Sequence, residues 1–134
     1  MKPIRLDGNS LTREQVVAVA YGASVELDTK QLEKVQRAAD FLAEQVQKQE
    51  PIYGVSTGVG SHSKHAVDPA HIHEFAYQII RQHGCGLGEM FSVQPARAIV
   101  FARLVSLAKG YSAVRLELLQ ALCGLLQQGV IPVI

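Results

Sequence analysis

A continuous apolar stripe between residues 29 and 49 constrains the fold of this chain more than any other feature. Its members recur in steps of three and four residues, the spacing of one helical face: Leu32, Val35, Ala39, Leu42 and Val46. Asp28 precedes the stripe as a candidate N-cap, with Gln31 at the position of a capping box. Pro51 disfavours helical conformation at the residue before it, so we expect this helix to end near Gln49.

Caps and breakers predict the other elements, which make the chain mainly α with a few short N-terminal strands. The expected segments are strands at Pro3–Leu6 and Ser24–Leu27, and helices that begin near Thr12, Asp68, Pro95 and Ser112. The helix after Asp68 should bury one apolar face, made of Ile72, Phe75, Ala76, Ile79 and Ile80. The last two helices are apolar on nearly all sides, which indicates that they pack into something larger.

Composition points to an ordinary globular domain over residues 1–134. Thirteen Lys and Arg residues against 12 Asp and Glu give a formal net charge of +1, so nothing suggests nucleic acid or a membrane as a partner. The sequence has neither a signal peptide nor a long apolar run, and its two cysteines are too few for a disulfide scaffold. We therefore expect a cytoplasmic protein with free thiols.

The segment Ile52–His65 carries three glycines, hydroxyl residues and two histidines. It lacks the strand–turn–helix setting of a phosphate loop or a dinucleotide site, which disfavours nucleotide binding. The histidines at 62, 65, 71 and 73 do not form a recognised zinc pattern, so exposed histidines are favoured over a metal site. We predict no metal.

Tyr53 and His83 are the candidate chemical groups that remain. A phenol ordinarily has a pKa near ~10 and is a poor base at neutral pH, unless nearby donors stabilise the phenolate. Glycines around Tyr53 could bring it close to a ligand, but a structural tyrosine is the simpler interpretation. His83 ends a predicted helix, where it could stabilise the helix dipole or contact a pocket.

The glycine segment resembles a known motif. Tyr53–Gly60 is similar to the Tyr-Gly-Val-Asn-Thr-Gly-Phe-Gly signature of the histidine and aromatic amino acid ammonia-lyases and related aminomutases. Further segments resemble that family in the same order along nearly the whole chain: Leu6–Thr12, His83–Gly88, Gly110–Arg115 and Ile131–Ile134. The resemblance implies the N-terminal portion of the fumarase/aspartase-like helical fold and an oligomer, a tetramer in the full-length family.

The resemblance also implies a reaction and a set of residues. Members eliminate ammonia from an amino acid to give an α,β-unsaturated acid, using a self-derived 4-methylidene-imidazol-5-one group formed from Ala-Ser-Gly. The catalytic base maps onto Tyr53, and the substrate-binding histidine maps onto His83. Gly60 and Ser56 then line the substrate-binding mouth.

This sequence departs from the family pattern in informative ways. Ser56 and Val59 replace Asn and Phe, so histidine, tyrosine and phenylalanine all stay open as substrates, for a lyase or an aromatic aminomutase. No Ala-Ser-Gly occurs in the 134 residues; by resemblance it would follow a short distance beyond Ile134. We expect an N-terminal fragment or split subunit that is inactive alone and needs a C-terminal part or partner subunits. The alternative is a non-catalytic binding or interaction module derived from the same fold.

Overall fold

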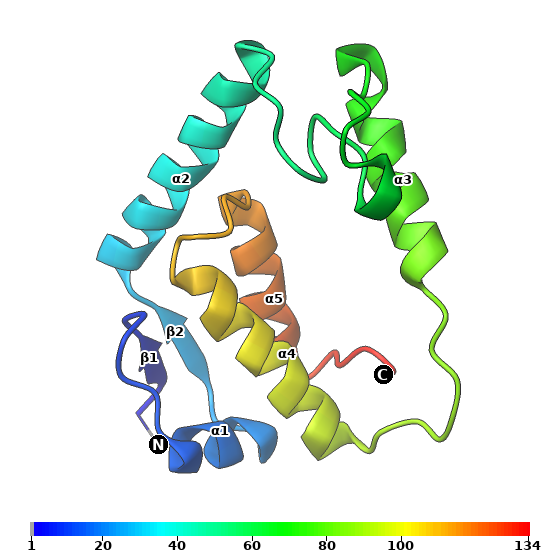
Figure 1. Ribbon diagram of the computed structural model, residues 1–134. Helices are drawn as coiled ribbons and strands as arrows, with labels where there is room; N and C mark the ends of the chain where they lie inside the picture. The colour runs from blue at the N-terminus through cyan, green and yellow to red at the C-terminus, as the bar shows by residue number, and fades with distance from the viewer. Residues whose placement is uncertain (1) are drawn as a thin grey trace. The chain divides into compact units, whose positions relative to one another are not determined.

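The computed structural model describes residues 2–134, which form two compact units (Figure 1). The first unit contains the N-terminal segment up to Phe41 together with Glu89–Ile134. The second unit is Leu42–Gly88, and it contains all four residues of the predicted site. The expectation of one domain over residues 1–134 stays a prediction.

Two short parallel strands open the first unit. β1 (Ile4–Leu6) pairs with β2 (Val25–Leu27), with Ile4 opposite Val25. Parallel strands need a crossover between them, and here α1 (Arg13–Ala20) supplies it. The predicted helix start near Thr12 is confirmed by a capping box, since the Thr12 hydroxyl accepts from the Gln15 N–H and the Gln15 side chain accepts from the Thr12 N–H.

The start of α2 (Thr29–Gln47) corrects one detail of the prediction. Asp28 does cap the helix, because its carboxylate accepts from the Lys30 N–H at 2.8 Å. Gln31 does not complete a box. The Asp28 N–H donates instead to the Leu6 carbonyl at 3.2 Å, and the Gln31 amide lies against Gly8. The Asp28 N–H, which a capping box requires as donor, is therefore used in a bond to β1.

The helix ends two residues earlier than expected, through a backbone motif. The Glu50 N–H bonds to the Gln45 carbonyl at 3.2 Å, and the Gln49 N–H bonds to the Val46 carbonyl at 3.0 Å. This pair of bonds is a Schellman motif, whose turning residue adopts the left-handed conformation. Gln49 occupies that position with φ +60°. The chain therefore turns at Gln49, before Pro51 is reached.

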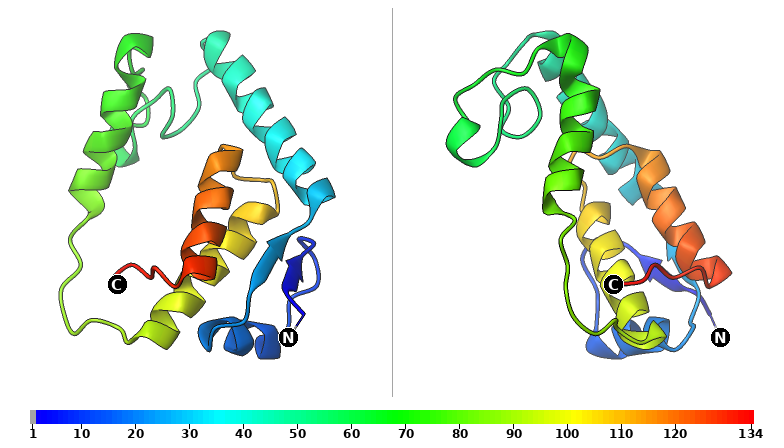
Figure 2. Two further views of the ribbon diagram at one scale, coloured as in Figure 1. Left: turned by 180° about the vertical axis from the view of Figure 1, so that it is seen from behind. Right: turned by 90° about the vertical axis from the view of Figure 1, so that its right-hand side faces the viewer.

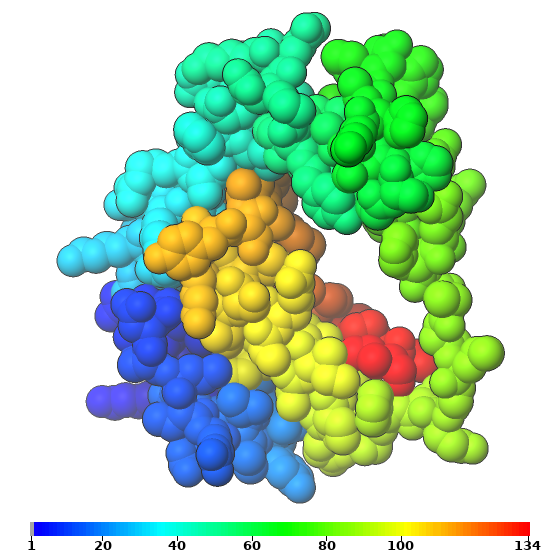
Figure 3. Space-filling model, viewed as in Figure 1, coloured from blue at the N-terminus to red at the C-terminus, as the bar shows by residue number. Residues whose placement is uncertain are grey.

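Helices α4 (Val93–Ala108) and α5 (Leu116–Gln128) build the core of the first unit. Phe101, Leu104 and Leu119 are fully buried there. The two ribbons lie side by side in both further views (Figure 2). In the space-filling view the yellow atoms of α4 lie directly against the blue N-terminal segment, consistent with the packing of α1 on α4 (Figure 3). Within residues 2–134, no helix has both the length and the apolar character needed to cross a membrane.

The last helix begins later than the sequence indicates. Ser112 was the expected cap, but α5 starts at Leu116 and its N-cap position is Arg115. The intervening backbone is not helical, because Gly110 and Ala113 both have positive φ values, +73° and +50°. α5 is also buried on one side only, at Leu119, Cys123 and Leu126.

In the second unit, Asp68 caps a 3₁₀ turn, Pro69–His71, that leads into α3 (Ile72–His83). The Asp68 carboxylate accepts from the Ala70 N–H at 2.9 Å, as the predicted helix start requires. The prediction that α3 buries this apolar face is wrong. Ile72, Phe75 and Ile79 are half-buried, whereas Ala76 and Ile80 are exposed. The apolar pattern is present, but no layer of the unit covers it.

Candidate functional site

The glycine segment folds into a narrow hairpin. Thr57 and Ala66 form an antiparallel bridge, flanked by bonds from the Val67 N–H to the Ser56 carbonyl at 2.9 Å and from the Gly58 N–H to the His65 carbonyl at 3.0 Å. Residues 59–64 close the hairpin and include a 3₁₀ turn, Gly60–His62. The predicted loop is therefore an ordered structure with its own hydrogen bonds.

Gly58 is required by the closeness of this packing. A Cβ at Gly58 would lie 2.5 Å from the His62 carbonyl oxygen, a separation at which the backbone must shift. His62 itself is held by a bond from its N–H to the Val59 carbonyl at 3.0 Å. The hairpin closes tightly because position 58 has no side chain.

Tyr53 reaches across the hairpin to Gly60. The Gly60 N–H donates to the phenol oxygen of Tyr53 at 3.1 Å. Gly60 has φ +57°, a left-handed conformation that glycine adopts at little cost. The ring remains accessible, since 65% of Tyr53 is exposed. Two of the predicted site residues are thus in direct contact. The phenol oxygen is held by a hydrogen bond, and the ring is accessible to a ligand.

The Ser56 hydroxyl bonds to nearby backbone groups. It accepts from the Ile52 N–H at 2.7 Å and donates to the Glu50 carbonyl at 2.5 Å. The side chain therefore bonds to the loop's own backbone, in the turn that carries Tyr53. The sequence pattern identified Ser56 as a polar loop residue but gave no sign of these partners.

His83 lies at the C-terminal end of α3. Its Nδ1 is 2.8 Å from the Ile79 carbonyl oxygen, and because a carbonyl only accepts, Nδ1 is the protonated nitrogen in this contact. Nε2 has no partner among the side chains of residues 2–134, so it is free to bond a ligand. No hydrogen bond in this part of the chain joins His83 to the hairpin.

A cavity of about 430 Å³ lies on the second unit beside the hairpin. It runs from the end of α2 to the beginning of α3, and Ser56, Thr57 and Asp68 supply polar atoms to its wall. Tyr53, Gly60 and His83 are not among its lining residues. Of the four predicted site residues, Ser56 lines this cavity and the other three do not.

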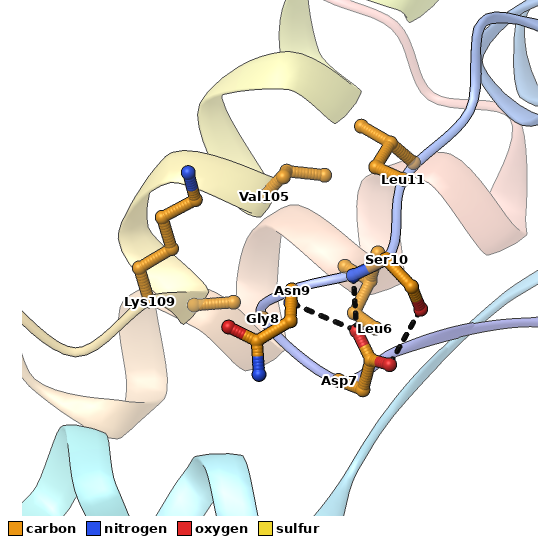
Figure 4. A pocket seen from close by; sticks show the side chains of 9 residues that line it. Leu6, Asp7, Gly8, Asn9, Ser10, Leu11, Val105 and Lys109 are labelled. Carbon is orange, nitrogen blue, oxygen red and sulfur yellow. Dashed lines mark hydrogen bonds between the residues drawn. The ribbon is translucent and has the colours of Figure 1, made fainter.

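A smaller cavity, of about 200 Å³, lies in the first unit between the loop after β1 and the end of α4 (Figure 4). Asp7 is the charged group of that loop. Its carboxylate accepts from the Ser10 hydroxyl and from the N–H groups of Ser10 and Asn9. The Ser10 hydroxyl bond, followed by these backbone bonds, lowers the pKa of Asp7 to about 2.

The hairpin carries the histidine pair His62 and His65. The rings of His62 and His65 are exposed, with centroids 5.6 Å apart. Across residues 2–134, no group of three or more histidine, cysteine or acidic side chains is arranged to hold a metal ion.

Comparison with known proteins places these features in a family context. The sequence profile of the aromatic amino acid lyase family matches residues 11–134. A histidine ammonia-lyase 2 from Fusobacterium nucleatum is 35% identical over 134 residues, and a histidine ammonia-lyase from Streptococcus gordonii is 37% identical over 132 residues. These alignments cover 99% and 98% of this chain but only 26% of each relative, so the chain spans about a quarter of their length.

Solved structures show the same relationship. The tyrosine aminomutase of Streptomyces globisporus superposes with a TM-score of 0.92 at 38% identity, over 96% of this chain and 24% of its own. A histidine ammonia-lyase from Trypanosoma cruzi gives 0.84 at 28% identity, over 94% of this chain and 25% of its own. The helical arrangement described above therefore matches one segment of these larger enzymes.

Proposed function

Because the chain belongs to the aromatic amino acid lyase family, we propose that it supplies the base-carrying part of an ammonia-lyase active site. The substrate is histidine or an aromatic amino acid, and the product is the corresponding α,β-unsaturated acid. The bond between Tyr53 and Gly60 carries this proposal, because it holds an exposed phenol in a defined position.

Tyr53 is the general base of the elimination. It takes a proton from the β-carbon of the substrate; the electrons of that C–H bond form the Cα–Cβ double bond, and ammonia leaves from Cα. A base must lie within hydrogen-bond reach of the proton that it removes, so the orientation of the ring matters. The Gly60 N–H supports this role, because its bond to the phenol oxygen becomes stronger when that oxygen carries negative charge.

His83 and the hairpin contribute to substrate binding. With Nδ1 engaged by the Ile79 carbonyl, the His83 ring is fixed and offers Nε2 as an acceptor to a polar group of the substrate. Gly60 adds a surface without a side chain next to the phenol. Ser56 is considered separately below, because its hydroxyl bonds to the loop itself.

The family's electrophile does not fit the residues of this chain. When bound, 4-methylidene-imidazol-5-one activates the amino group of the substrate as a leaving group, and it forms from Ala-Ser-Gly. The one Ala-Ser pair here, Ala23-Ser24, is followed by Val25, which is buried and paired in β2. We therefore propose that this chain alone does not turn over, and that another segment or subunit supplies the electrophile.

Complementation tests the proposal. The chain is mixed with a polypeptide that carries the remaining family length, and the absorbance of the unsaturated acid is followed with histidine, tyrosine and phenylalanine. We expect activity only in the mixture, and a loss of at least about a hundredfold in kcat with Tyr53→Phe. Product analysis separates a lyase from an aminomutase, which would release a β-amino acid. A folded mixture that is inactive on all three substrates would contradict the enzymatic proposal.

A further inference from the structure

Ser56 is hydrogen-bonded to several parts of the hairpin. Its hydroxyl connects to Glu50, just after α2, and to Ile52. Its N–H donates to the Ile52 carbonyl at 3.0 Å, and its carbonyl accepts from the Val67 N–H at 2.9 Å, on the arm of the hairpin that leads to α3. One small side chain and its peptide groups thus connect the segments on both sides of Tyr53.

The bonding capacity of the hydroxyl limits what else it can do. A serine hydroxyl has one proton to donate, and here that proton goes to the Glu50 carbonyl oxygen. One of its two lone pairs accepts the Ile52 N–H. A substrate carboxylate or carbonyl needs a donor, and Ser56 has none left unless the turn opens. A role as hydrogen-bond donor to the substrate would therefore conflict with the fold of the loop.

We propose that Ser56 is a positioning residue, whose hydroxyl holds the turn at residues 52–57 so that the Tyr53 phenol meets the Gly60 N–H. This inference rests on the proposed role of Tyr53 and assigns Ser56 away from the substrate-contact role that the family resemblance implies. The link is short. Ile52 is bonded to the Ser56 hydroxyl, Tyr53 follows Ile52 directly, and the phenol bonds to Gly60.

Amide hydrogen exchange measured by NMR on the 134-residue chain tests this connection without any turnover. In Ser56→Ala, we expect exchange of the Ile52 amide to become roughly tenfold faster, because its acceptor is removed. The Gly60 amide should also exchange several-fold faster, because the phenol that protects it is no longer held in place. Ser56→Thr keeps the hydroxyl and should restore both rates.

Two control variants define the origin of the signal. Tyr53→Phe removes the acceptor of the Gly60 N–H, so it should accelerate Gly60 exchange and leave the Ile52 amide protected. Ser61→Ala makes the same chemical change as Ser56→Ala at an exposed position of the same hairpin, and both amides should keep their rates. If Ser56→Ala accelerates Ile52 but leaves Gly60 unchanged, the positioning role is wrong.

Steady-state kinetics of the complemented enzyme provide the second readout. A positioning residue acts through Tyr53, so Ser56→Ala should lower kcat about tenfold with little change in KM, and Ser56→Thr should recover most of the loss. A substrate contact would instead raise KM. Should Ser56→Ala fail to fold, Ser56→Thr and Ser56→Val, which have the same shape and differ in the hydroxyl, give the same comparison. Full activity of Tyr53→Phe would overturn the proposed function, whereas a KM effect at Ser56 would overturn only this inference.

Discussion

The guanidinium of Arg97 on α4 donates from Nε to the carbonyl oxygen of Val19 on α1, at 2.9 Å and across 78 residues of sequence. Arg97 is 7% exposed and is one of the few polar residues in the core of the first unit. Its side chain is buried, and its bond reaches the last turn of α1. This contact joins α1, the crossover helix between β1 and β2, to α4.

Replacement of Arg97 by alanine should destabilise the first unit by roughly 1–3 kcal/mol, from the lost bond and the lost packing of the stem. Urea denaturation followed by circular dichroism measures this change. Arg103→Ala removes an exposed arginine from the same helix and should change the free energy of unfolding by less than about 0.5 kcal/mol. Equal effects of the two variants would show that the Arg97–Val19 bond contributes nothing specific.

Gly58→Ala should disrupt the hairpin, because the new Cβ would lie 2.5 Å from the His62 carbonyl oxygen. The expected result is loss of amide protection at position 58, whose N–H bonds to the His65 carbonyl, and at Gly60, whose N–H bonds to the Tyr53 phenol. Gly86→Ala is the matched control, since nothing lies within 4 Å of a Cβ at that position. Hydrogen exchange that is unchanged in Gly58→Ala would contradict the close approach described here.

The carboxylate of Asp7 should contribute to stability in a pH-dependent way. Its pKa is about 2 in the folded chain, against an ordinary value of 3.8, so the folded state favours the ionised form. The contribution is therefore complete above pH 3.8 and is lost as the pH falls through 2. Wild type should be more stable than Asp7→Asn at pH 6, and the difference should shrink between pH 4 and pH 2. A difference that stays constant over this range would argue against the Ser10 and Asn9 bonds.

The two thiols should react at very different rates. Cys85 is exposed, whereas Cys123 is buried in the core against α4 and β2, and that burial raises the pKa of the Cys123 thiol. The thiolate is the reactive form. Burial therefore protects Cys123 in two ways, because it blocks the reagent and disfavours ionisation of the thiol. An aromatic disulfide reagent should label Cys85 within seconds to minutes and Cys123 only when the chain unfolds. Rapid labelling of both thiols in the native chain would contradict the packing of α5.

Local signals were sufficient for the helices that have a cap within the sequence itself. Thr12 and Gln15 lie three residues apart and satisfy each other, so α1 follows from that pair alone. Asp68-Pro69 likewise begins its helical segment through a bond to the nearby Ala70 N–H. The same logic failed at Gln31, where a group distant in sequence decided the outcome, and at Ser112, where the local backbone is not helical. The donor expected for Gln31 is bonded to β1, and the backbone between Gly110 and Arg115 is not helical.

The sequence by itself determined the helical periodicity, the caps and the motif that carries Tyr53, because each depends on residues close together in the chain. Only the tertiary structure decided that Arg97 is buried, that the Tyr53 phenol meets Gly60, and that the Ser56 hydroxyl bonds to backbone. Those outcomes depend on which hydrogen-bond partners and apolar surfaces the folded chain brings together. A pattern of residue types does not specify the partner of a hydroxyl or an N–H, since several are available until the backbone is fixed.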